Sequence, residues 1–147
     1  MNYQNSVDIL LVEDNPRDTE LTIRAINKHN SSSRIIALED STQALDFIFC
    51  KGKYANREIT NHPKVILLDL KLPKIDGLEM VKIIKSDERT KMIPVVMVTS
   101  SRQDSDIKTA YQFGVNSYVV KPVDFNALVE TMSHLVLYWL IVNQSPI

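Results

Sequence analysis

Glycine is scarce in this chain of 147 residues, which contains only three, at positions 52, 77 and 114. At the average usage of about 7%, a chain of this length would contain roughly ten glycines. Three isolated glycines can build neither a Gly-x-Gly-x-x-Gly fingerprint nor a glycine-rich phosphate loop. The shortage therefore excludes the common loops that cradle nucleotides.

Cysteine is also scarce, and neither sign of charge is in excess. Cys50 is the only cysteine, which excludes an internal disulfide and suits a reducing compartment. Seventeen Lys and Arg against 18 Asp and Glu give a net charge of −1, so there is no bulk attraction to nucleic acid or anionic membranes. The polar N-terminus predicts no signal peptide, and the longest apolar run, Leu135–Val142, falls short of the roughly 20 residues that span a bilayer. We therefore expect a cytoplasmic protein.

Apolar runs of strand length alternate along the chain with segments of helical periodicity. Strands are predicted at residues 8–12, 34–38, 65–68, 95–98 and 117–120. Each is followed by a predicted helix, and Asn15, Ser41 or Thr42, and Asp124 are the expected N-caps of the first, second and last helices. Five such units predict an α/β fold of the flavodoxin-like (CheY-like), doubly wound kind, with five helices and a parallel sheet of order 2-1-3-4-5. One domain is expected to fill residues 1–147.

Polar residues follow four of the predicted strands. Glu13 and Asp14 end the first strand, Asp69 the third, Thr99 the fourth and Lys121 the fifth. Ligands of open α/β sheets bind beyond the carboxyl ends of the strands, where the strand order reverses. Each residue alone is an ordinary cap or surface residue. Together they predict three carboxylates, a hydroxyl and an ammonium at one edge of the sheet.

Three crowded carboxylates repel one another unless a cation compensates their charge. Hard oxygen ligands without an accompanying histidine or cysteine favour Mg²⁺ over zinc. A carboxylate beside Mg²⁺ can act as a nucleophile and form an acyl phosphate. Lys121 would bring a positive charge to the phosphoryl oxygens and Thr99 a hydroxyl donor. The residue types therefore predict phosphoryl transfer.

The chain resembles the receiver domains of two-component response regulators in four segments. These are Leu11–Asn15, Leu67–Pro73 with Gly77, Thr99–Ser100 and Tyr118–Pro122. The resemblance spans about residues 7 to 140. It implies a protein that accepts a phosphoryl group from a sensor histidine kinase or phosphotransfer protein.

The resemblance also implies roles for the matching residues. Asp69 would be the phosphoacceptor, and Glu13, Asp14 and Asp69 would bind Mg²⁺ together with the backbone carbonyl of Lys71. The protein would catalyse its own phosphorylation and lose the phosphoryl group slowly to water, without being a turnover enzyme.

Two further features of the family match the second half of the chain. Thr99 and Tyr118 resemble the switch pair, in which the hydroxyl moves toward the phosphoryl group and the ring packs inward behind it. In the family the peptide between Lys121 and Pro122 is cis. Within the family, the chain is similar to the single-domain regulators of cyanobacterial phytochromes, through the long loop Lys51–Pro63 and the aromatic pair at positions 138 and 139.

Other readings are weaker. The apolar run before Asp69 also fits a Walker B strand, but the Walker A partner is lacking. A haloacid-dehalogenase phosphatase needs a second aspartate at the position of Lys71. A receiver-like module that signals without phosphorylation stays open as the alternative from another class.

The last helix predicts an interaction surface, since no output domain is expected to follow it. Its buried stripe is expected at Leu128, Met132, Leu135 and Trp139. The remaining apolar residues would then face outward, with Val129 and Val142 beside the predicted interface of Val136, Leu137, Leu140 and Ile141. Such patches are unusual on monomers. We expect a homodimer through the helix-four, strand-five, helix-five face, unless the end of the chain packs back on the sheet.

Overall fold

A parallel five-stranded sheet forms the centre of the protein, of which the computed structural model describes residues 6–29 and 32–146. Its strands are β1 (Ile9–Val12), β2 (Ile35–Leu38), β3 (Val65–Leu68), β4 (Val95–Thr99) and β5 (Ser117–Val120). They lie in the order β2-β1-β3-β4-β5, and every neighbouring pair is parallel. The predicted fold and strand order are confirmed.

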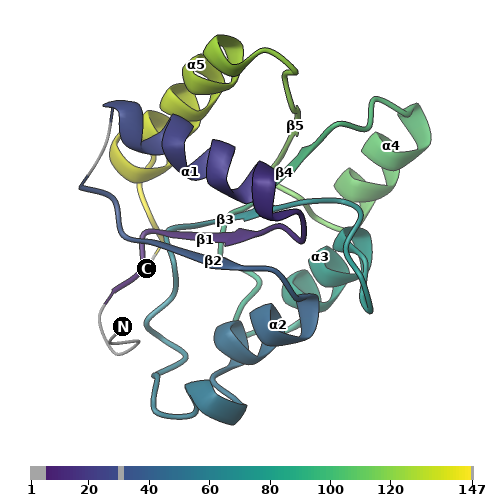
Figure 1. Cartoon of the computed structure of the whole chain (residues 1–147). Coiled ribbons are helices and arrows are strands. Elements are labelled where there is room, and N and C mark those ends of the chain that lie inside the picture. The colour runs from purple at the N-terminus through teal and green to yellow at the C-terminus, as the bar shows by residue number, and fades with distance from the viewer. Residues whose placement is uncertain (1–5, 30–31, 147) are drawn as a thin grey trace.

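Helices cover both faces of this sheet (Figure 1). They are α1 (Pro16–His29), α2 (Ser41–Phe49), the short 3-10 helix η1 (Gly52–Tyr54), α3 (Gly77–Ser86), α4 (Asp104–Gln112) and α5 (Phe125–Val136), which continues as the π-helix η2 (Leu137–Val142). Helices α1 and α5 pack on one face, and α2, α3 and α4 on the other. The layers therefore form a three-layer sandwich with the sheet in the middle.

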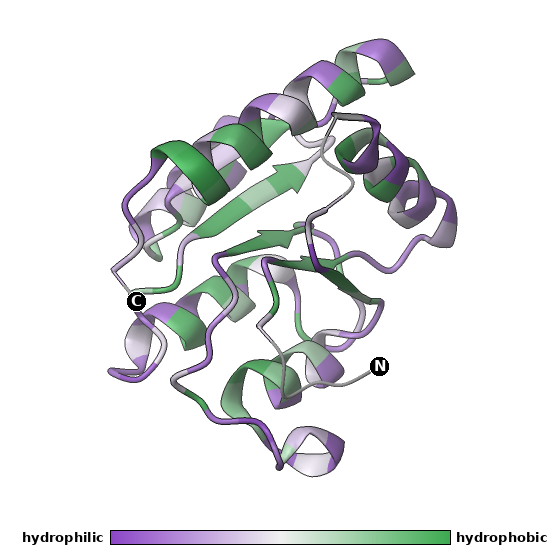
Figure 2. Cartoon of the chain, turned by 90° about the vertical axis from the view of Figure 1, so that its left-hand side faces the viewer, coloured by the Kyte–Doolittle hydropathy of each residue, from purple (hydrophilic) through white to green (hydrophobic). Residues whose placement is uncertain are grey.

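The central strands are buried on both faces because almost every residue in them is apolar. In β1, Ile9 and Leu11 pack with the α1 and α5 side, whereas Leu10 and Val12 pack with the α2, α3 and α4 side. Figure 2 shows the mostly hydrophobic strands between helices that carry both hydrophobic and hydrophilic residues. This two-sided core fixes the register of β1 against β3, and with it the places where the two strands end.

The N-cap residues predicted from the sequence are found at two of the three helices. The side chain of Asn15 accepts a hydrogen bond from the N–H of Arg17 (2.9 Å), and that of Asp124 from the N–H of Ala127 (3.0 Å). The cap of α2 is Asp40, neither Ser41 nor Thr42. Ser41 is fully buried and its hydroxyl donates instead to the Pro73 carbonyl at 2.8 Å, and Asp40 is the residue whose carboxylate faces the helix start.

The peptide between Lys121 and Pro122 is trans, as are the other peptide bonds of the described residues, so the expected cis bond is wrong. The trans form of an X-Pro bond is favoured intrinsically by about 0.5–1 kcal/mol. The backbone at this point is also tied to β4, because the Lys121 N–H donates to the Thr99 carbonyl at 2.7 Å.

The last helix buries more of its apolar residues than its sequence suggested. Val136 is 3% exposed and Val129 6%, so both belong to the core and the assignment of Val136 to an interface is wrong. The reason is the rotation of α5 on the sheet, which turns these valines toward α1 and the neighbouring strands. Leu137 and Ile141 are 51% and 65% exposed, and Leu140 is half-buried.

The continuous helical segment Phe125–Val142 is long and apolar enough, by length and composition alone, to cross a membrane. Four of its residues are nevertheless buried against the sheet and α1 of the fold: Leu128, Val129, Met132 and Val136. Packing within the domain therefore accounts for the apolar character of its first part, α5.

The backbone before α3 lies against Gly77 so closely that no side chain fits there. An added Cβ would lie 2.2 Å from the Asp69 carbonyl oxygen and 2.9 Å from the Leu70 Cα. At the first turn of a helix, alanine would otherwise stabilise the protein by up to about 1 kcal/mol relative to glycine.

Replacing Gly77 by alanine is expected to lower the free energy of unfolding by about 3 kcal/mol, measured by urea denaturation, because backbone atoms cannot yield to the new methyl group. Gly52→Ala is the control. Gly52 has a φ of +58°, and an added Cβ would meet only the Asp46 side chain, with Oδ2 at an ordinary contact distance of 3.4 Å. That variant should cost only about 1–2 kcal/mol. A neutral or stabilising Gly77→Ala would contradict the close approach.

Candidate functional site

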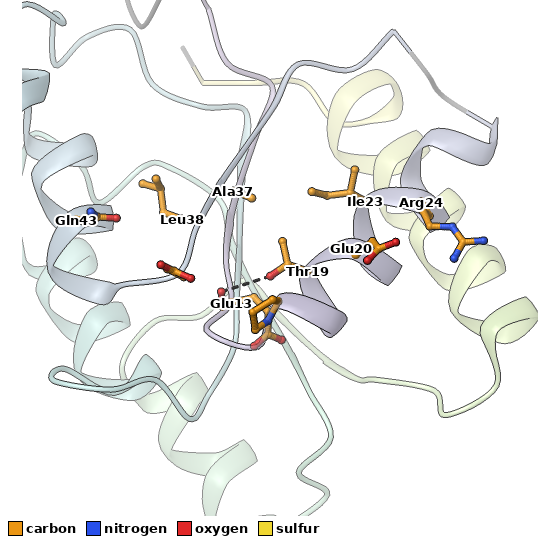
Figure 3. A pocket seen from close by; sticks show the side chains of 10 residues that line it. Glu13, Thr19, Glu20, Ile23, Arg24, Ala37, Leu38 and Gln43 are labelled. Carbon is orange, nitrogen blue, oxygen red and sulfur yellow. Dashed lines mark hydrogen bonds between the residues drawn. The ribbon is translucent and has the colours of Figure 1, made fainter. Parts of the chain in front are cut away.

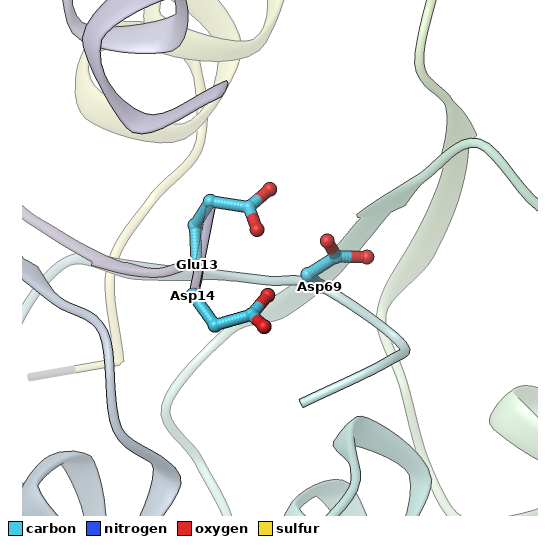
Figure 4. A group of neighbouring side chains, drawn as sticks. All are labelled: Glu13, Asp14 and Asp69. Atoms are coloured by element: carbon cyan, nitrogen blue, oxygen red, sulfur yellow. The ribbon is translucent and has the colours of Figure 1, made fainter. Parts of the chain in front are cut away.

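Three carboxylates meet where β1 and β3 end. Glu13 and Asp14 follow β1, Asp69 follows β3, and one oxygen from each lies within 4.8 Å of the others. Figure 4 shows the three side chains converging from these two strand ends. Glu13 is buried, Asp69 is half-buried and Asp14 is exposed, so the group opens to solvent on one side. The predicted clustering of the three acids is confirmed.

The parallel register explains this arrangement. The N–H of Asp69 donates to the Val12 carbonyl at 3.1 Å, which places Asp69 directly beside the residue that precedes Glu13. One oxygen of Asp69 also accepts the N–H of Leu70 at 2.7 Å, leaving the rest of the carboxylate free to face the cluster. Lys71 lies two residues further along the same loop, with its side chain exposed.

Lys121 reaches the cluster from the end of β5. Its Nζ donates to Glu13 Oε1 at 2.8 Å and lies 3.9 Å from Asp69 Oδ2. A further carboxylate, that of Asp18 on α1, lies 3.7 Å from the same Nζ. The sequence-based prediction missed Asp18. Its position in the first turn of the helix that starts at the same strand end is the signal that could have found it.

Burial and charge shift the pKa values of the central pair. Burial raises the pKa of Glu13 to about 7, although the hydrogen bond and charge of Lys121 act in the other direction. Burial also lowers the pKa of Lys121, but the hydrogen bond to Glu13 and the nearby negative charges outweigh it, so that this pKa is raised overall. The ammonium of Lys121 therefore stays charged at neutral pH.

Thr99 and Tyr118 lie on the neighbouring strands β4 and β5. Thr99 is 3% exposed, and its hydroxyl accepts the N–H of Ser101 at 3.4 Å. The Tyr118 hydroxyl donates to the Ser101 carbonyl at 3.0 Å, while the ring packs against the core on the α4 side. Ser101 thus connects the two residues in the loop after β4.

A groove of about 530 Å³ opens beside the cluster, between α1 and the edge strand β2 (Figure 3). Glu13, Thr19 and Ile23 line one side, and Leu38 and Gln43 the other. The Thr19 hydroxyl donates to the Glu13 carbonyl at 3.4 Å, which ties α1 to the end of β1. The groove shares Glu13 with the acidic cluster.

The model of the response regulator receiver domain matches residues 9–133, which include every strand and most of α5. The chain belongs to the response regulator receiver family. The response regulator is 42% identical over 138 residues to the probable methanogenesis regulatory protein FilR2 of Methanothrix harundinacea, covering 94% of this chain and 86% of that protein. It is 35% identical over 132 residues to response regulator Rcp1 of Synechocystis sp., covering 90% and 88%.

Solved structures agree with this assignment. The crystal structure of the phosphorylated cyanobacterial phytochrome response regulator RcpA has a TM-score of 0.88 and 34% identity, covering 97% of this chain and 100% of that one. The Mn²⁺-bound form of Rcp1 has a TM-score of 0.85 and 34% identity, covering 96% and 99%. The similarity to phytochrome response regulators inferred from sequence is confirmed.

A divalent cation at the cluster should bind more tightly as the pH rises. Glu13 has a pKa of about 7 in the metal-free site, so below this pH a proton neutralises one of the three carboxylates. We expect the affinity for Mn²⁺, measured by isothermal titration calorimetry, to rise between pH 6 and pH 8 by up to about tenfold and then to level off.

Two variants control this measurement. Asp14→Asn removes one carboxylate of the cluster and should weaken Mn²⁺ binding at every pH by at least about tenfold, the loss seen even for groups that only support metal ligands. Glu88→Gln removes an exposed carboxylate paired with Lys91 and should leave binding unchanged. An affinity that is flat with pH, or equal in the Asp14 variant, would contradict the site.

Proposed function

We propose that this response regulator accepts a phosphoryl group on Asp69 from a histidine kinase or phosphotransfer protein, and signals through a changed interaction surface. One observation carries the proposal. The Asp69 carboxylate ends a buried strand in a group of three acids that is open to solvent, with the Lys121 ammonium 3.9 Å away. A nucleophile, a place for a cation and a fixed positive charge are therefore together.

The chemistry follows from the residues at the cluster. A carboxylate oxygen of Asp69 attacks the phosphorus of a phosphohistidine, and the bond from phosphorus to the imidazole nitrogen breaks. The ring nitrogen keeps the electron pair and takes up a proton, and Asp69 becomes an acyl phosphate. Lys121 neutralises charge on the transferred oxygens, for which its Nζ moves from Glu13 toward Asp69.

The three acids fit a magnesium ion, because they are hard oxygen ligands that crowd negative charge. Glu13, Asp14 and Asp69 would hold it together with the Lys71 carbonyl. When bound, Mg²⁺ supplies positive charge to the phosphoryl oxygens. The cation would then compensate the charge of the buried Glu13, which would allow Lys121 to turn from Glu13 to the phosphoryl group.

Thr99 and Tyr118 would carry the signal from Asp69 to the surface. The Thr99 hydroxyl is buried at the end of β4 and accepts the Ser101 N–H at a long 3.4 Å, so it can turn toward a phosphoryl group. The Tyr118 hydroxyl donates to the Ser101 carbonyl, in the loop that Thr99 would displace. Phosphorylation would shift the population of the α4, β5 and α5 surface.

The response regulator is a signalling protein, and we infer that it catalyses its own phosphorylation and slow dephosphorylation. Its sensor kinase would be of the phytochrome type or another histidine kinase, in the cytoplasm. The alternative is an interaction module that works without phosphorylation. The cluster of Glu13, Asp14 and Asp69, together with Lys121 paired to Glu13, favours the phosphoacceptor.

Acetyl phosphate and Mg²⁺ should raise the mass of the intact protein by about 80 Da, the mass of one phosphoryl group. Asp69→Asn should abolish this species, because an amide oxygen is too weak a nucleophile to form it. Asp104→Asn, an exposed residue in the first turn of α4, is the control and should be phosphorylated normally. Wild-type protein that gains no phosphoryl group would favour the alternative module.

We also propose a homodimer through the α4, β5 and α5 face. Support comes from the exposed apolar side chains at the end of the chain, Leu137, Tyr138, Ile141 and Val142. They adjoin a groove of about 540 Å³ beside the edge strand β5, lined by Val119 and other residues of β5 and the last helix. A second copy would cover both features.

Light scattering is expected to show a dimer at concentrations of about tens of micromolar, in the range where standard-sized interfaces associate. Ile141→Glu should shift it toward the monomer, because a charge is costly to bury at an apolar contact. Met92→Glu changes another exposed apolar residue, 56% exposed before β4, and should leave the dimer intact. A wild-type monomer would refute the proposed interface.

A further inference from the structure

Asp18 reaches Lys121 from the first turn of α1, outside the group of acids that fits a metal. Its Oδ2 lies 3.7 Å from Lys121 Nζ, and Asp69 Oδ2 lies 3.9 Å from the same atom. The hydrogen bond of Lys121 goes to Glu13 at 2.8 Å. The ammonium therefore has one close partner and two further carboxylates at nearly equal distances.

The Asp18 side chain lies on the solvent side of Lys121 and is more exposed than the other carboxylates around it. The Asp18 side chain is 40% exposed, compared with 14% for Lys121, 15% for Asp69 and 3% for Glu13. The backbone of Asp18 is held, because its N–H donates to Asn15 Oδ1 at 3.2 Å. Only the side chain is left to adjust, and it can follow the ammonium at the rim of the site.

Asp18 and a phosphoryl group on Asp69 each attract the Lys121 ammonium, but to different positions. Transfer needs the ammonium at the developing negative charge beside Asp69. Each arrangement in which Nζ turns toward Asp18 withholds that charge from the transferred group. Within the described residues, Lys121 is the cation paired with Asp18, so the competition is direct.

We propose that Asp18 is a positioning residue that competes with Asp69 for Lys121 and thereby slows phosphoryl uptake. This inference rests on the proposed function, because only an acceptor at Asp69 requires Lys121 on that side. An acid at this rim position sets how readily the protein is phosphorylated, while leaving the nucleophile and the metal ligands untouched.

The rate of phosphorylation by acetyl phosphate with Mg²⁺, followed by intact mass, tests this inference. Asp18→Asn keeps the shape of the side chain and removes its charge. Its rate should exceed that of the wild type by about twofold to fivefold, the effect of one partly exposed ion pair. The gain should shrink near 1 M salt, where the Debye length is about 3 Å.

Glu20→Gln is the matched control, since it removes an exposed charge from the same helix two residues away. Its rate should stay at the wild-type value. A second control is Lys121→Met, in which Asp18→Asn should produce no gain, because the effect works through the ammonium. If Asp18 only stabilised the start of α1, the effect of Asp18→Asn on the rate would be the same with and without Lys121.

A measurement without phosphorylation checks the pair itself. In urea unfolding of the metal-free protein, a double-mutant cycle of Asp18→Asn and Lys121→Met should show a coupling of up to about fivefold in the unfolding equilibrium constant. The proposal would be overturned if Asp18→Asn left the phosphorylation rate unchanged, or if Glu20→Gln raised that rate equally. An equal gain from Asp18→Asn in the Lys121→Met background, or zero coupling in the unfolding equilibrium, would also overturn it. Wild-type protein that takes up no phosphoryl group would contradict the proposed function, and this inference with it.

Discussion

The ion pair between Lys121 and Glu13 is the contact on which the site depends. It joins the end of β5 to the end of β1, across two intervening strands, through a hydrogen bond of 2.8 Å. Both groups are largely buried, and removing one partner of such a pair leaves an uncompensated charge that typically costs about 3–5 kcal/mol. The pair therefore holds the acid cluster together, and any chemistry there must redistribute the charge of Lys121.

The negative charge of the site exceeds its fixed positive charge, so the site favours the binding of a further cation. Glu13, Asp69 and Asp18 face one ammonium, and Asp14 adds a further carboxylate to the cluster, so the arrangement has room for more positive charge and for a rearrangement of Lys121. A bound divalent cation and a phosphoryl group change this balance in opposite directions. The loop after β4, where Thr99 and Tyr118 meet Ser101, lies next to the place where the charge changes.

The topology and the acid cluster could be predicted from sequence because both follow from where apolar runs end. Once β1 and β3 are parallel neighbours, residues 13, 14 and 69 must share one sheet edge. Features that depend on packing between distant segments could not be predicted this way. Asp40 caps α2 because the Ser41 hydroxyl bonds to the Pro73 carbonyl instead. The burial of Val136 depends on the rotation of α5. The contact of Asp18 with Lys121 joins two elements that are far apart in the chain.

The chain is similar both to the probable methanogenesis regulatory protein FilR2 and to the cyanobacterial phytochrome response regulator RcpA. The central claim is the identity of the acceptor, Asp69. Reduction of the phosphorylated protein with borohydride converts an aspartyl phosphate to homoserine, and peptide mass mapping then locates it. We expect homoserine at position 69 alone. Homoserine at another aspartate, or none in a protein that carries a phosphoryl group, would contradict the account.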